Sequence, residues 1–148
     1  MRCRFRRMTH YTLLLITPLA FNQALASDAA STDRRTSLGL NANEKAAFLS
    51  EMRQMLASVQ GVIAGIGDEN PEKIAAAARQ SGGRMARATP ESIRNKLPQS
   101  FKELGGPTHM LFEELAIRAD TDDMQSLASF TGELMQQCTA CHEKFKVD

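Results

Sequence analysis

The chain of 148 residues contains no tryptophan, a single tyrosine and only three cysteines. Two of the cysteines lie close together near the C-terminus, so no disulfide framework of the kind that supports small exported domains can form. The sequence also lacks strand-like alternation of useful length and any uninterrupted apolar run of the ~20 residues that a membrane-spanning helix needs. These absences leave a helical domain without a transmembrane helix.

The first 26 residues have the three parts of a secretory signal peptide. Four arginines and no acid precede the apolar run 11–21, and Ala24-Leu25-Ala26 forms a small-x-small cleavage site. A membrane anchor is the alternative, but the run is short and Pro18 interrupts it. We therefore expect residues 1–26 to be cleaved and the mature protein to lie in the periplasm, with no integral membrane segment.

Cleavage changes both the cysteine content and the charge. Cys3 leaves with the signal peptide, so the mature chain keeps only Cys138 and Cys141. It retains 14 basic against 17 acidic residues, a balance that gives no reason to expect binding to nucleic acid or to an anionic membrane. Residues 27–42 are rich in Ser, Asp, Thr and Arg without periodicity, which predicts a flexible leader.

From residue 43 onward, apolar residues recur at alternating steps of three and four, the spacing of helices in a bundle. We expect a first helix from Asn43 to about residue 66, a second that opens at Pro71, an interrupted arm over 91–118 with a break at Gly105-Gly106-Pro107, and a last helix after Asp120-Thr121-Asp122-Asp123. Short links between these segments predict an all-α, antiparallel up-down-up-down four-helix bundle over residues 43–148.

The last helix carries the sequence Cys138-Thr139-Ala140-Cys141-His142, a C-x-x-C-H motif. On a helix the two thiols and the imidazole point the same way, so the thiols can form thioethers with the vinyl groups of one covalent haem c while His142 binds the iron. A redox dithiol is the first alternative, but it is expected in a βαβ unit. A structural zinc site is the second, but it needs four ligands, and the fourth would have to be the distant His109.

The C-terminal position of this motif, in the fourth of four helices, resembles the class II c-type cytochromes, the cytochrome c′ family. The resemblance implies that His142 is the proximal iron ligand. A Tyr-Arg or similar pair often follows in that family, and here the corresponding positions hold Phe145 and Lys146, so Lys146 keeps a positive charge near the haem. It also implies a homodimer built on the first two helices.

A one-electron carrier for redox partner proteins in the periplasm is the leading hypothesis, with no enzymatic activity of its own. The alternative is a five-coordinate, cytochrome c′-type binder or scavenger of nitric oxide or carbon monoxide. A peroxidase is disfavoured because no distal His-Arg pair is visible around the first helix. We expect His109 to be a surface or capping residue.

The sixth iron ligand distinguishes the two leading hypotheses. Met52 and Met55 both lie on the inward seam of the first helix, one turn apart, although methionine at such positions is usually a core filler. Met52 is closer to the helix start and, in an antiparallel bundle, nearer to the level of His142. We expect Met52 to be the sixth ligand and Met55 to be the second choice.

Overall fold

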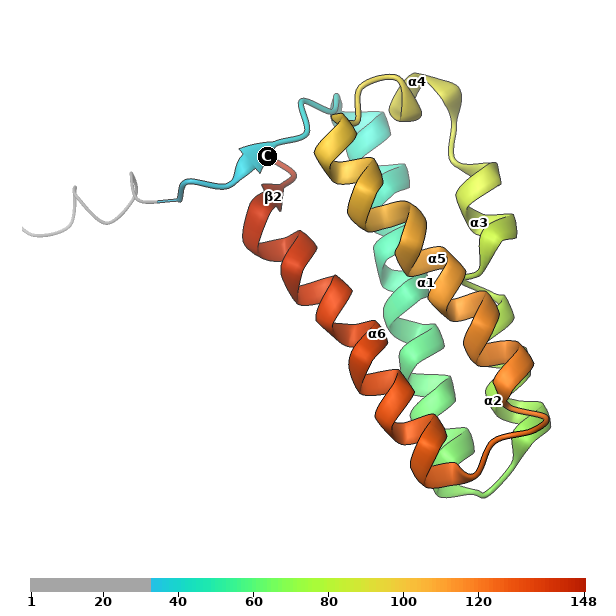
Figure 1. Cartoon of the computed structure of the whole chain (residues 1–148). Coiled ribbons are helices and arrows are strands. Elements are labelled where there is room, and N and C mark those ends of the chain that lie inside the picture. The colour runs from blue at the N-terminus through green and yellow to red at the C-terminus, as the bar shows by residue number, and fades with distance from the viewer. Residues whose placement is uncertain (1–32) are drawn as a thin grey trace, which may run out of the picture. The chain divides into compact units, whose positions relative to one another are not determined.

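A computed structural model describes residues 33–148, and most of them are helical (Figure 1). The predicted signal peptide, 1–26, lies outside the described residues, as do residues 27–32 of the predicted leader. Within the described part of the chain, none of the helices is both long and apolar enough to cross a membrane.

Helix α1 spans Ala42–Gly67 and begins where the sequence predicts. The Asn41 side chain accepts hydrogen bonds from the backbone N–H groups of Asn43 and Glu44, and the Glu44 carboxylate accepts one from the Asn41 N–H at 2.9 Å. This reciprocal capping box satisfies N–H groups that have no partner inside the helix.

Residues 71–94, where we expected the second helix and the start of the arm 91–118, form three short helices. Helix α2, Pro71–Arg79, opens on Pro71 with Asn70 as its cap, as predicted. Helix α3, Gly83–Ala88, follows the Ser81-Gly82 turn, and helix α4, Glu91–Arg94, follows Pro90.

The predicted break at Gly105-Gly106-Pro107 is wrong. Helix α5 runs without interruption over Gln99–Arg118 and contains Pro107. Phe101 and Phe112 are buried on either side of the proline, so packing holds both halves in one helix although Pro107 removes an internal hydrogen bond. Pro98 occupies the N-cap position of α5 and makes no side-chain hydrogen bond there.

Helix α6, Met124–Lys144, is capped by Asp123, whose carboxylate accepts from the Ser126 N–H at 2.8 Å. Beyond it, strand β2, Phe145–Lys146, pairs in parallel with strand β1, Thr36–Ser37. The two-residue strands were not predicted. Residues 36–38 of the predicted leader are therefore hydrogen-bonded to the end of the chain, and Leu38 is buried.

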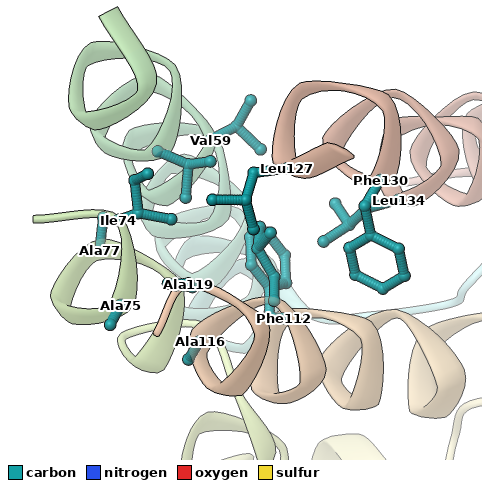
Figure 2. Packing of buried hydrophobic residues seen from close by; sticks show 13 residues of the cluster. Val59, Ile74, Ala75, Ala77, Phe112, Ala116, Ala119, Leu127, Phe130 and Leu134 are labelled. Carbon is teal, nitrogen blue, oxygen red and sulfur yellow. The ribbon is translucent and has the colours of Figure 1, made fainter. Parts of the chain in front are cut away.

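The helices pack in pairs: α1 against α2, α2 against α5, α5 against α6, and α6 against α1. Their buried side chains form two separate clusters. The larger, which we call the lower cluster, is shown in Figure 2, and its largest members are Val62, Ile74, Phe112, Leu115, Leu127, Phe130 and Leu134. The smaller, which we call the upper cluster, consists of Leu38, Phe48, Ile93, Leu97, Phe101 and Phe145.

Helices α1 and α2 approach closely because α1 presents glycines to α2. A Cβ atom added at Gly65 would lie 2.7 Å from Cγ1 of Ile74 and 3.0 Å from its backbone nitrogen, and one added at Gly61 would lie 2.7 Å from Cβ of Ala77. These distances leave no room for a side chain at either position.

Gly65→Ala should therefore destabilise the fold by about 1–3 kcal/mol, because the new methyl group must push Ile74 away. Urea unfolding monitored by circular dichroism measures the change. Gly132→Ala is the matched control, since a Cβ at this helical position meets nothing within 4 Å and should stabilise by up to about 1 kcal/mol. A higher urea midpoint for Gly65→Ala would contradict the close approach.

Candidate functional site

A cavity of about 500 Å³ lies between the two clusters and is lined mainly by apolar side chains. Three long helices supply most of its wall: Phe48, Met52, Met55 and Val59 from α1, Phe101, Gly105, Gly106 and His109 from α5, and Met135, Cys138, Cys141 and His142 from α6. Several residues of this lining are exposed, among them Leu56 at 69% and Met135 at 41%, so the cavity is open to solvent. Its size and apolar character are those of a site for a small organic molecule.

Helix α6 brings all three residues of the C-x-x-C-H motif to this cavity. Cys138 packs against the lower cluster and Cys141 against the upper one, so the motif bridges the gap between them. Both cysteines are half-buried and free, and His142 is exposed. The Arg35 guanidinium donates a hydrogen bond to the His142 carbonyl oxygen at 3.4 Å, which ties the segment before β1 to the motif.

The surroundings of the two thiols argue against a redox dithiol. Burial raises the pKa of Cys138, and burial together with the nearby Cys138 raises the pKa of Cys141. Redox-active C-x-x-C pairs instead lower the pKa of a cysteine so that the reactive thiolate forms near neutral pH. The two thiols therefore remain protonated near neutral pH in this fold.

The two candidate methionines both line the cavity from α1, and both are half-buried. Met52 packs with the upper cluster, as Cys141 does, whereas Met55 packs with the lower cluster, as Cys138 does. Met52 thus shares the level of Cys141 and of its neighbour His142. Met52 and Met55 therefore lie about one helical turn apart along α1, each at the level of a different cysteine of the motif.

His109 is not the surface or capping residue that the sequence led us to expect. It is half-buried and lines the cavity, and its Nδ1 atom lies 2.7 Å from the Ser81 carbonyl oxygen. Because a carbonyl only accepts, Nδ1 carries the proton. The incorrect prediction of a helix break at Gly105-Gly106-Pro107 is the reason that His109 was assigned to the surface. In the continuous helix α5, His109 lies one turn after Gly105 and on the same face.

Glu51 is a half-buried carboxylate in the cavity wall, next to Met52 in the chain. Burial raises its pKa, which a hydrogen bond from Thr89 at 3.4 Å and the neighbouring His109 partly offset. The cavity wall near Met52 is thus not wholly apolar. Glu51, Thr89 and His109 come from α1, the end of α3 and α5, so no spacing along the chain predicts that they meet.

Three cations, Arg53, Arg94 and Lys102, also belong to the lining, and the sequence did not single them out. They come from α1, α4 and α5, so no spacing along the chain could have grouped them. Lys146, the basic residue predicted to lie near the haem, is absent from the described cavity wall; its ammonium is 3.0 Å from the Asp148 carboxylate and its backbone pairs with β1.

Over residues 33–148, no group of three or more His, Cys, Asp or Glu side chains could hold a bare metal ion. A structural zinc site at the motif is therefore unsupported in the described part of the chain. No protein-family model, curated protein or solved structure matches this sequence.

In the full chain produced without haem, the thiols of Cys138 and Cys141 should titrate at higher pH in the native state than in urea, because burial disfavours the thiolate. The pH dependence of alkylation by iodoacetamide measures this, with the urea-unfolded chain as reference. A native thiol that titrates near neutral pH, below the unfolded reference, would contradict this description and support a redox dithiol.

Proposed function

We propose that this protein is a periplasmic c-type cytochrome that carries one covalent haem and transfers single electrons between partner proteins. The observation that carries the proposal is the convergence of Cys138, Cys141 and His142 on one apolar cavity of about 500 Å³. When bound, haem supplies an iron that cycles between the ferric and ferrous states.

The residues present fit this group. Cys138 and Cys141 are unpaired, half-buried thiols one turn apart, suited to the two thioether bonds, and His142 supplies the imidazole for the iron. The apolar walls exclude water from most of the macrocycle. The cationic lining residues, Arg53, Arg94 and Lys102, offer partners for the two propionate carboxylates that every haem carries.

The helix packing supports an antiparallel four-helix bundle of the cytochrome c′ type. We assign α1, α5 and α6 to three of its helices and the pieces α2, α3 and α4 together to the remaining one. The ring of contacts, α1 with α2, α2 with α5, α5 with α6 and α6 with α1, is what such a bundle requires.

Met52 is the proposed sixth ligand because it lies at the level of Cys141 and lines the cavity. A methionine and histidine pair would raise the reduction potential and suit an electron carrier. The mainly apolar lining of the cavity favours the second candidate, a five-coordinate binder of nitric oxide or carbon monoxide, if the methionine does not reach the iron.

Covalent attachment is tested on the purified mature protein. Haem should stay with the polypeptide through denaturation and acid-acetone extraction, and the double variant Cys138→Ala with Cys141→Ala should release it. Met110→Ala is the control, because Met110 is 63% exposed and lies outside the cavity lining. Extraction of haem from the parent protein would overturn the c-type assignment.

The sixth ligand is tested separately. The ferric parent protein should show the methionine-to-iron charge-transfer band, Met52→Ala should lose it, and Met55→Ala should keep it. If the band is lost only in Met55→Ala, Met55 is the sixth ligand, one helical turn from Met52. A parent protein without this band is not a methionine-ligated carrier, and the gas-binding function then takes its place.

A further inference from the structure

Charge is unevenly distributed between the two halves of the helical unit. The half that contains the C-x-x-C-H motif, residues 34–54, 87–104 and 137–148, holds ten Lys and Arg side chains against six Asp and Glu. The other half, residues 55–86 and 105–136, holds four against nine. We call these halves the basic end and the acidic end. The nearly neutral total therefore conceals a strong charge separation along the helices.

The fold itself creates this separation. The N-terminal part of α1, the N-terminal part of α5 and the C-terminal part of α6 meet at the basic end, as the packing of Phe48, Phe101 and Phe145 shows. The rings contact each other at an angle rather than face to face: the Phe48 and Phe101 centroids are 5.7 Å apart with the planes tilted by 57°, and the Phe101 and Phe145 centroids are 5.3 Å apart with the planes at 72°. Cations that are far apart in the sequence are thereby collected around the C-x-x-C-H motif.

Several of these cations lie on the outer surface beside the motif. Arg34, Arg35 and Lys144 line one shallow hollow of about 420 Å³, together with Thr36, Ser100, Glu143 and Phe145. The pairing of β1 with β2 fixes this surface, and Arg35 also donates to the His142 carbonyl. The basic surface thus adjoins the proposed haem ligand.

Part of the negative charge at the basic end is already neutralised. Glu44 is paired with Lys96 at 2.6 Å, and Asp148 is paired with Lys146 at 3.0 Å. Since each pair removes one charge of either sign, the excess of cations rests on the remaining residues, including Arg34 and Lys144. The net field at this end is positive.

We propose that the basic end is the docking surface for a redox partner with an acidic surface around its own electron-transfer site. This inference rests on the proposed function, because an electron carrier must present its haem edge to its partner. Opposite charges would steer the two proteins together, and the acidic end would repel the partner from the wrong orientation.

The positive electrostatic field around the basic end is tested with two small oxidants of opposite charge. The hexacyanoferrate(III) anion and the tris(phenanthroline)cobalt(III) cation each oxidise the ferrous protein. Stopped-flow rates are measured between about 0.01 M and 0.15 M salt, where the screening length shortens from roughly 30 Å to roughly 8 Å. The rate with the anion should fall as salt rises, and the rate with the cation should rise.

A matched pair of charge-reversal variants locates the effect. Lys144→Glu at the basic end should slow the reaction with hexacyanoferrate(III) roughly fivefold at low salt. Lys73→Glu changes the net charge equally but lies at the acidic end, and it should leave the rate nearly unchanged. Both substituted lysines are on exposed helix positions, and circular dichroism verifies that each variant folds.

Equal effects of the two variants, or rates independent of salt, would overturn the docking surface. A covalent haem spectrum in the same samples would leave the proposed function intact in that case, whereas absence of haem would refute that function itself. Vesicles containing phosphatidylglycerol provide the last comparison. Sedimentation of the parent protein with them, abolished in Lys144→Glu, would assign the basic end to a membrane surface and overturn the protein partner.

Discussion

Close packing is the constraint on which this structure depends. A protein interior leaves few voids larger than a water molecule, yet a cavity of about 500 Å³ separates the two apolar clusters here and opens to solvent. Its mainly apolar walls therefore stay in contact with water and contribute no hydrophobic stabilisation unless another molecule covers them. The cavity is therefore best explained as the place of a molecule that completes the core.

The C-x-x-C-H motif lies where such a molecule must be held. Cys138 touches one cluster and Cys141 the other, so a group bonded to both thiols would join the two halves of the interior. The rest of the fold keeps this place open: Gly105 and Gly106 bring α5 past it without side chains, and the pairing of β1 with β2 anchors the chain end beyond the motif. The elements that stabilise the fold therefore also keep the cavity open next to the motif.

Local chemistry made much of the framework predictable from the sequence. Asn41 caps α1 and Pro71 opens α2, as their residue types predict. Helical spacing placed Met52 and Met55 on the inward face of α1, and Cys138 and Cys141 on the inward face of α6, and all four line the cavity. Pro107 misled the prediction because tertiary packing of its neighbours outweighs the loss of one hydrogen bond.

The unpredicted features all depend on contacts between distant segments. His109 faces the cavity because Ser81, from the turn between α2 and α3, accepts its hydrogen bond. Arg94 joins the wall from a one-turn helix, and the two-residue strands are too short to leave a pattern in the sequence. Helical spacing along the chain therefore predicted which helix faces carry the cysteines and methionines. The polar residues of the cavity wall could be identified only from the folded structure.

The measurement that tests this account most directly compares urea unfolding of the haem-loaded mature protein with that of the same chain produced without the attachment machinery. If the cofactor completes the core, the loaded protein should unfold in one cooperative transition at clearly higher urea, and the haem-free chain should show a lower midpoint and a shallower slope. Identical midpoints and slopes would show that the core is complete without haem and would contradict the central claim.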